Sequence, residues 1–357
     1  MLRGLTTVPR RHDLHGHHAS EIARGSHLRR NQLGLVCLLV VLATAAVVSL
    51  AFGSKQVDLQ SVFDALFQFH GTEDETVVRG LRLPRTELAV AVGVALGLSG
   101  VVMQAATRNP IADPGLLGVN SGAALAVVLA IYTFGVVSPV GFIWFAFVGA
   151  FVTSAVVYTV GSAGRDGATP VKLALAGAGV TALVGALTNA VLLGGGATLA
   201  SYRFWAVGSL AGRSENILFN VLPFLSAGVI LAFALGVPLN VLSLGDEPAR
   251  SLGQRVGVTR AVSVATVLLL VGASVSAAGP IAFVGLMVPH AARAIVGPDY
   301  RWVMPYSAVL AAILVICADV LGRAIARPGE IEVSVVTAVI GTPFLVMLIR
   351  RRRVVGL

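Results

Sequence analysis

The sequence contains ten predominantly apolar stretches of 17 to 24 residues, separated by polar segments. A helix rises about 1.5 Å per residue and the hydrocarbon core of a bilayer is about 30 Å thick, so about 20 apolar residues cross it. A helix also satisfies its backbone hydrogen bonds internally, as lipid requires. The sequence therefore predicts an all-α, polytopic membrane protein with ten transmembrane helices at Leu33–Phe52, Pro84–Thr107, Pro114–Phe134, Pro139–Gly161, Lys172–Leu193, Ile217–Val237, Thr259–Ala278, Pro280–Val296, Val303–Gly322 and Val333–Ile349.

Charge and cysteine content agree with a membrane protein. Only 12% of the 357 residues are charged, against roughly 25% in soluble domains. Residues 1–32 are polar and are expected to form a disordered cytoplasmic tail, ahead of a ten-span domain at residues 33–353. No small-residue cleavage site follows the first apolar run, which favours a retained span over a signal peptide. Cys37 and Cys317 both fall inside predicted spans, which disfavours a disulfide or a cysteine-based metal site.

The distribution of Lys and Arg predicts the orientation in the membrane. The net charge is +9, and most of the 26 Lys and Arg residues lie in the two termini and in alternate loops. Because basic residues concentrate on the cytoplasmic side of membranes, both termini are predicted to be cytoplasmic. The same bias explains the basic excess without a nucleic-acid partner.

The loop at residues 238–260 is predicted to contain a short cytoplasmic helix. Asp246 is placed to cap it, Glu247 and Pro248 suit its first turn, and Gly253 suits the position after its end. Because such a helix does not hold the bundle together, it is a candidate docking surface. An incidental interfacial helix is the alternative.

A proline-rich turn follows the second predicted span. Pro110 and Pro114 force a non-helical turn, and Asp113 is placed to cap the third span. A stiff turn at the mouth of a bundle can form a constriction. A simple corner between two helices remains the alternative.

Three arginines, Arg82, Arg85 and Arg323, are predicted to lie at the outside ends of the spans, opposite the cytoplasmic turn. Asp319 and Arg323 are spaced to pair at i,i+4, whereas Arg82 and Arg85 flank Leu83-Pro84 with no nearby acid except Glu87. Unpaired arginines beside a rigid proline suit recognition of a carboxylate on another protein. Interfacial snorkelling, in which a long side chain reaches from the apolar region to the polar surface, is the alternative.

Polar groups inside the predicted spans are few. The amides Gln104, Asn120 and Asn189 are expected to face a water-lined path, because polar groups are costly in hydrocarbon. His290 has no second His or Cys in a neighbouring span, so a packing or hydrogen-bonding role is preferred and no metal site is predicted. Neither lysine of the chain follows a phosphate-binding glycine loop, so the chain cannot bind ATP in the P-loop manner and any energy from ATP must come from another chain.

Four motifs together resemble a known family. They are RLPR at Arg82–Arg85, RNPIADPGLLGVNSGA at Arg108–Ala123, LNVLSLGDEPARSLG at Leu239–Gly253 and GPIAFVGLMVPHAAR at Gly279–Arg293. In this order and spacing they resemble the FecCD (vitamin B12 and iron-siderophore) permeases of type II ABC importers, from about Leu33 to Arg353. The chain departs from the family pattern at residues 330–334, where EIEVS replaces E-L-P-V-G, and at Ala282, which replaces a usual glycine.

The resemblance implies a type II ABC importer permease fold and a set of partners. A ten-span subunit pairs with a second permease, identical or related, around a translocation path along the dimer axis. Two ABC ATPase subunits lie on the cytoplasmic side, and a substrate-binding protein delivers substrate outside. The chain itself is expected to bind no cofactor, with ATP and Mg held by the ATPase partner.

The resemblance also assigns roles to residues that match the motifs. ATPase coupling is expected from Leu244, Gly245, Asp246, Glu247, Ala249, Arg250, Leu252 and Gly253. Docking of the binding protein is expected at Arg82, Arg85 and Arg323. The cytoplasmic gate is expected at Asn109, Pro110, Ile111, Thr169 and Pro170.

The function predicted from these likenesses is transport without catalysis. The chain is expected to be a permease subunit in the inner (cytoplasmic) membrane of a bacterium, carrying a ferric siderophore. The segment ADPGLLGVN reads most like ferric-catecholate permeases. Haem or cobalamin cargo is the alternative within the same fold. An ion-coupled secondary transporter or an intramembrane enzyme is disfavoured, because acidic residues lie in loops or near span ends.

Overall fold

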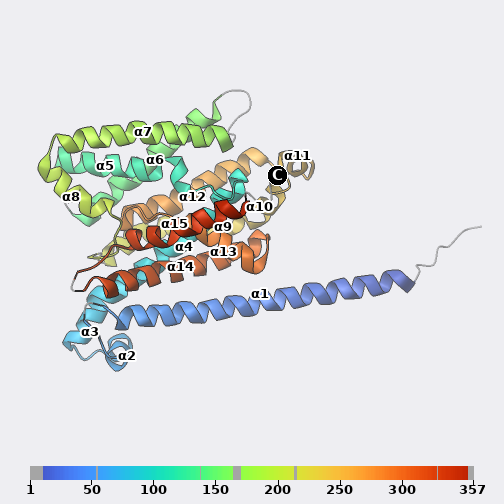
Figure 1. The fold of residues 1–357 in the computed structure, drawn as a ribbon, viewed down its shortest axis with the longest axis horizontal. Helices are drawn as coiled ribbons and strands as arrows, with labels where there is room; N and C mark the ends of the chain where they lie inside the picture. Colours follow the sequence, from blue (N-terminus) through green and yellow to red (C-terminus); the bar gives the residue numbers. More distant parts are fainter. Residues whose placement is uncertain are drawn as a thin grey trace, which may run out of the picture.

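A computed structural model describes residues 11–53, 55–136, 138–163, 170–212, 215–327 and 329–352, with most of the side chains from Leu28 onward. All regular structure in these ranges is helical (Figure 1). In chain order the helices are α1 (Arg11–Ala51), α2 (Leu59–Phe67), α3 (Glu73–Val77), η1 (Val78–Arg82), α4 (Leu83–Thr107), η2 (Pro114–Leu117), α5 (Val119–Phe134), α6 (Pro139–Ser162), α7 (Pro170–Leu193), α8 (Gly196–Ala206), α9 (Glu215–Ala234), α10 (Gly236–Leu242), α11 (Asp246–Ser251), α12 (Val256–Ala278), α13 (Val284–Val296), α14 (Tyr300–Ile325) and α15 (Val333–Arg352).

The apolar helices correspond one to one with the ten predicted spans. Within the ranges above, seven helices are long and apolar enough to cross a membrane, and α5, α13 and α15 are shorter apolar helices. The all-α fold predicted from the sequence is therefore confirmed. The seventh and eighth spans are separate helices, since α12 ends at Ala278 and the next residue, Gly279, has φ of 76°, which ends the helix before α13.

Helix α4 forms the centre of the bundle and packs against α14, α12 and α13. Small residues permit this close packing. A Cβ atom on Gly97 would lie 2.4 Å from the carbonyl oxygen of Ser307 in α14. One on Gly100 would lie 1.9 Å from that of Gly285 in α13. Both distances are far below van der Waals contact, so larger side chains at these positions would push the helices apart.

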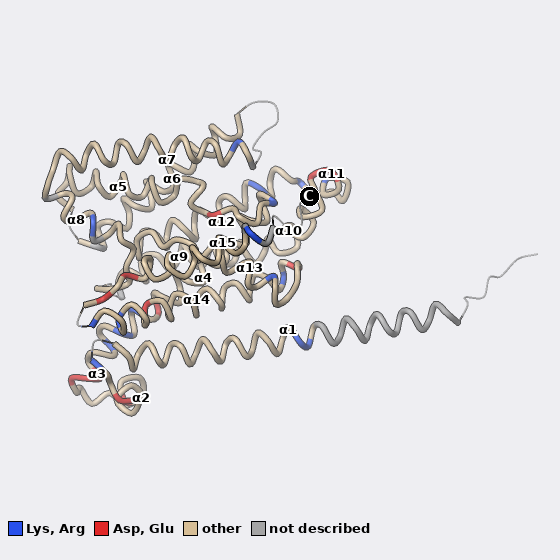
Figure 2. The backbone as a smooth tube through the Cα atoms, in the orientation of Figure 1, with Lys and Arg blue, Asp and Glu red and all other residues tan. Residues whose placement is uncertain are grey.

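Figure 1 shows α11 at one end of the bundle and α2 and α3 at the other. These ends are called the α11 end and the α2 end. Charged residues gather toward the two ends, and the middle of the bundle is mostly uncharged (Figure 2). This distribution is what a bilayer around the middle of the bundle requires.

Helix α1 begins earlier than the sequence analysis expected. It starts at Arg11, within the tail that was expected to be disordered, while residues 1–10 lie outside the described ranges. Extending an existing helix needs no new nucleus, which explains how polar residues continue the apolar span. Helix α1 packs against α14, where the Tyr306 hydroxyl donates to the carbonyl of Asn31 at 2.7 Å.

Candidate functional sites

The loop at residues 238–260 folds into α10 and the short helix α11 at the α11 end. The expected helix is present, and Gly253 follows its end with φ of 82°. The expected cap is wrong: Gly245, with φ of 117°, occupies the N-cap position, and Asp246 is the first helical residue. The Asp246 carboxylate instead binds arginines of other segments.

Three guanidinium groups surround the Asp246 carboxylate. Its Oδ1 accepts a hydrogen bond from Nη2 of Arg260 in α12 at 3.0 Å. Nη2 of Arg108 lies 3.6 Å from the same oxygen, and Nη2 of Arg250, one turn along α11, lies 4.0 Å from Oδ2. The pairs with Arg260 and Arg108, together with the buried Ala249, attach the inner face of α11 to the bundle.

The outer face of α11 is exposed and chemically mixed. Glu247 and Arg250 are exposed on the helix, and Leu244 and Leu252 flank it at 63% and 67% exposure. Leucines this exposed at the charged, α11 end of the bundle, beside a helix that carries both charges, suit contact with another protein.

The predicted gate turn begins directly after α4. Arg108 ends this helix in the left-handed conformation, with φ of 49°, a position where glycine is favoured. Its N–H donates to the carbonyl of Ala105, and the N–H of Asn109 donates to that of Gln104, which together form a Schellman motif. The Asn109 side chain then accepts from the N–H of Ile111 at 3.1 Å, so the turn is internally braced.

The structure describes only some of the other residues in the predicted gate region. Asp113 caps the 3-10 turn η2, accepting from the N–H of Gly115 at 2.7 Å, and not the third span as expected. The left-handed Gly118 separates η2 from α5 and is the physical reason for the difference. Thr169 lies outside the described residues, and Pro170 begins α7.

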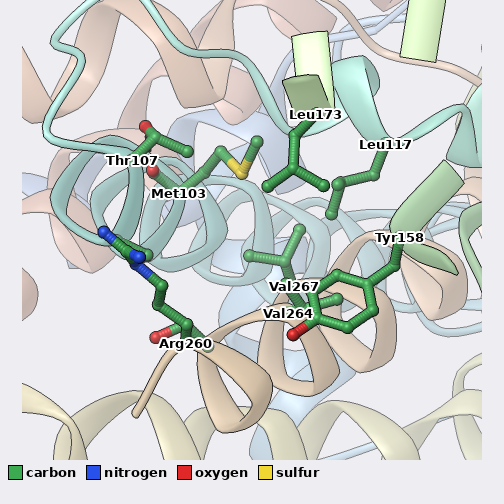
Figure 3. A pocket seen from close by; sticks show the side chains of 10 residues that line it. Met103, Thr107, Leu117, Tyr158, Leu173, Arg260, Val264 and Val267 are labelled. Atoms are coloured by element: carbon green, nitrogen blue, oxygen red, sulfur yellow. Dashed lines mark hydrogen bonds between the residues drawn. The ribbon is translucent and has the colours of Figure 1, made fainter. Parts of the chain in front are cut away.

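A small cavity lies at the α11 end, where α4, α6, α7 and α12 meet (Figure 3). Its volume of about 20 Å³ is room for about one water molecule, and its lining is almost entirely apolar. Thr107 and Arg260 lie on one side of it, with Leu117, Leu173 and Tyr158 on the other. The four helices are therefore incompletely packed beside the gate turn.

Arginines at the α2 end are buried, which corrects the expectation that Arg82 and Arg85 are unpaired at the surface. Arg82 is 6% exposed, and its Nη1 donates to the carbonyls of Leu50 and Ala51 at 2.7 and 2.8 Å. Arg323 is 4% exposed and donates to the carbonyl of Phe52 at 2.9 Å. Two arginines thus satisfy carbonyls at the end of α1 that no helical N–H can reach.

Asp319 joins two arginines at the same end. The predicted pair with Arg323 is confirmed at 2.9 Å, and Arg85 approaches Asp319 at 2.8 Å from α4. Arg85 also pairs with Glu330 at 2.8 Å. Asp319 is 1% exposed, so this carboxylate is a buried link between α4 and α14.

Asp64, His70 and Glu75 bring their ligand atoms within 4.8 Å of one another near α2 and α3. Glu75 is already engaged, because its Oε2 accepts from the backbone N–H groups of His70 and Gly71 at 2.6 and 2.8 Å. It also completes a capping box with Thr72 at the start of α3. Helix capping accounts for this arrangement without an ion.

Comparison with known proteins decides the family. Residues 38–351 match the FecCD transport family, which is most of the chain. The chain belongs to the FecCD transport family. The chain is also 42% identical over 317 residues to "Probable siderophore transport system permease protein YfiZ" of Bacillus subtilis (strain 168), covering 89% of this chain and 95% of that protein.

Two further comparisons support the assignment. The ferric enterobactin transport system permease protein FepD of Escherichia coli (strain K12) is 43% identical over 316 residues, covering 88% of this chain and 94% of FepD. A solved metal-chelate type ABC transporter in an inward-facing conformation has a TM-score of 0.79 at 29% identity. That match covers 90% of this chain and 99% of the solved chain. The importer permease fold implied by the sequence motifs is thereby confirmed.

The three amides expected along the path of a FecCD permease do not meet in this chain. Gln104 is buried, donates to the carbonyl of Leu286 at 3.1 Å and accepts from Arg293 at 2.5 Å. Asn120 is partly buried in α5, and Asn189 is exposed on α7. The Gln104 amide is thus used inside the bundle, and a path lined by Asn120 and Asn189 would involve the surfaces of α5 and α7.

Sequence reasoning missed two members of the group around Asp246. Arg108 is the first residue of the RNPIADPGLLGVNSGA motif, and Arg260 ends the loop that contains α11. Their positions in these segments were a signal, but nothing local in the sequence connects either residue to Asp246. His290 does have the hydrogen-bonding role that was preferred, since its Nδ1 lies 2.6 Å from Nη2 of Arg293.

Proposed function

We propose that this chain is the membrane-spanning permease subunit of an ATP-driven importer that carries a ferric siderophore across the cytoplasmic membrane of a bacterium. Membership of the FecCD transport family supports transport, and the names of YfiZ and FepD support siderophore cargo. The observation that carries the proposal is α11, a short helix fixed to the bundle by Asp246 and open to a partner on its other face.

In this proposal the α11 end faces the cytoplasm. Two ATPase subunits dock there and hydrolyse ATP with Mg, because this chain has no phosphate-binding loop. A second permease, identical or related, completes the path between the two chains, where Asn120 and Asn189 contribute polar groups, while Gln104 is bonded inside the bundle to Leu286 and Arg293. The path faces alternately outward and inward as ATP moves the α11 helices and the gate turns.

The substrate-binding protein docks at the α2 end, where Arg82 and Arg323 are too deeply buried to contact it directly. Arg85 is the arginine that an incoming carboxylate can reach, because its partner Glu330 is 31% exposed and can be displaced. Arg82 and Arg323 act beneath it by holding the end of α1. Their contribution to docking is support of the surface and not direct contact.

Charge reversal at Glu247 tests the coupling role. In the assembled importer, Glu247→Arg should lower both ATPase association and uptake, because Glu247 is exposed on the partner face of α11. Arg301→Glu is the control: it reverses an exposed charge at the same end, in α14, outside α11. Unchanged ATPase association and unchanged uptake in Glu247→Arg would contradict the proposed coupling surface.

Cargo is tested separately from coupling. Uptake of radioactive iron would be measured in cells with and without this chain, with a panel of catecholate and hydroxamate siderophores. Haem and cobalamin form further arms of the same assay. Uptake of haem or cobalamin in place of iron chelates would refute the siderophore assignment while leaving the permease assignment intact.

A further inference from the structure

The Asp246 carboxylate lies where three segments of the chain meet. It belongs to α11, and its Oδ1 is 3.0 Å from Nη2 of Arg260 in α12 and 3.6 Å from Nη2 of Arg108 at the end of α4. These contacts leave it 25% exposed, so water does not fully screen the group. One carboxylate therefore connects the exposed helix to two separate spans.

Arg108 immediately precedes the gate turn that begins at Asn109. Its backbone has φ of 49°, a conformation that glycine adopts without strain and arginine does not. The presence of arginine in place of glycine at this position is explained if the arginine side chain is needed. The Arg108 side chain reaches the carboxylate of Asp246. The turn beyond it is stiffened by the Asn109 side chain bond to the N–H of Ile111.

We propose that Asp246 is a positioning residue that transmits movement of α11 to the gate turn through Arg108 and to α12 through Arg260. The inference deepens the proposed function and depends on it. A shift of α11 cannot leave the end of α4 unchanged without breaking the contact between Asp246 and Arg108. Arg260 and Thr107 also line the small cavity between the ends of α4 and α12, so the two helix ends are not tightly packed against each other beside this link (Figure 3).

The test follows the gate turn in the assembled importer, with both permeases and both ATPase subunits. Cys37 and Cys317 are replaced by serine, and Ile111→Cys, at a position 46% exposed, reports the turn through its rate of maleimide labelling. The rate is compared without nucleotide and with ATP and vanadate. In the otherwise unchanged chain, nucleotide should alter the labelling rate.

Asp246→Asn and Arg108→Gln should each reduce this nucleotide-dependent change by about threefold, the effect expected of a partly exposed ion pair. Combining them should reduce it no further than the stronger single variant, because both remove one interaction. Arg108→Gly relieves the backbone strain but lacks the guanidinium, so it should lose as much as Arg108→Gln. Arg301→Gln, which removes an exposed charge from the ion pair with Asp299 at the same end, should leave the change intact.

The outcomes separate the two proposals. A parent complex without any nucleotide response overturns the proposed function as well as this link. A normal parent response that persists in Asp246→Asn and Arg108→Gln overturns only the link. A full response in Arg108→Gly shows that the Arg108 side chain is not needed, and this also overturns the link. Effects that multiply in the double variant show that Arg108 acts independently of Asp246, with the same consequence for the link. Arg108 lies outside α11, so its variants test the link even if Asp246→Asn weakens ATPase binding.

Discussion

Replacing Arg82 with methionine should destabilise the α2 end, because Arg82 donates to two backbone carbonyls at the end of α1. Methionine keeps much of the side-chain length and apolar contact but donates no hydrogen bond. The carbonyl of Leu50, a residue 4% exposed, then loses its 2.7 Å partner. The carbonyl of Ala51 keeps the N–H of Val57 at 3.1 Å, so it is only partly deprived.

The expected loss follows from these contacts. An acceptor left without a donor in a buried position costs about 1–3 kcal/mol, and a hydrogen bond to a charged donor contributes about 1.5–3 kcal/mol. In the Arg82→Met variant the Leu50 carbonyl loses its hydrogen bond completely. The loss at the carbonyls of Ala51 and Lys55 is only partial, because other donors or water can bond to them. Removal of a buried cation offsets some of the loss. We expect a net decrease of about 2–3 kcal/mol in the free energy of unfolding.

The measurement is equilibrium unfolding of the purified chain in mild detergent, titrated with a denaturing detergent. Arg79→Met is the comparison variant: Arg79 lies three residues earlier, is exposed, donates one hydrogen bond to the carbonyl of Ala65 and stacks over the Phe69 ring at 4.4 Å. Because it serves one carbonyl where Arg82 serves three, its loss should be about 1 kcal/mol, clearly smaller than that of Arg82→Met. If Arg82→Met is as stable as the unchanged chain but cannot dock a binding protein, Arg82 does not hold α1. That result would support direct contact between Arg82 and the binding protein.

Three further predictions concern packing and titration. Gly100→Ala should destabilise the chain by about 1–3 kcal/mol or more, since its Cβ would meet the Gly285 carbonyl, and thermal unfolding in detergent measures this. Tyr306→Phe should lose about 1 kcal/mol in the same assay, because the bond to the Asn31 carbonyl disappears. The Arg301 hydrogen bond holds the pKa of Asp299 below its usual range, with a smaller contribution from the Asn240 amide. The stability that Asp299 adds over Asp299→Asn should therefore be constant from about pH 5 to 8 and be lost as pH falls below about 4; a constant difference down to pH 3 would contradict this.

The spans could be predicted because their signal is local. Hydrophobic length alone located ten helices, and Pro110 and Pro114 located the turn between the second and third. The pair between Asp319 and Arg323 could be predicted for the same reason, since one helical turn separates the two residues. The start of the third span was predicted at Pro114, whereas α5 begins at Val119, because Gly118 adopts a left-handed backbone that the hydrophobic pattern does not reveal.

The partners of the other arginines could not be predicted, because they depend on which helices pack together. Arg85 and Asp319 are 234 positions apart, and nothing near either residue specifies the other. Arg82 looked free because its partners are backbone carbonyls at the end of α1, which every helix end carries. The same limit applied to Arg108, whose motif was recognised but whose acid lies in a distant loop.

Both ends of the bundle use arginines to hold an element that lies outside the core, but their burial differs. At the α2 end, Asp319 and Arg323 are at most 4% exposed, and separating buried charges of this kind costs about 3–5 kcal/mol. At the α11 end, Arg108 is 43% exposed and its pair with Asp246 is 3.6 Å long, so the interaction is screened and contributes about 1 kcal/mol or less. The bond from Arg260, 20% exposed and 3.0 Å from Asp246, also attaches α11 to α12. Because the pairs at this end are partly exposed, a bound partner can shift the joined groups together without separating buried charges, whereas the α2-end group cannot shift without that cost. Burial therefore predicts that α1 stays fixed to the bundle, while α11 moves together with the ends of α4 and α12 to which Asp246 connects it.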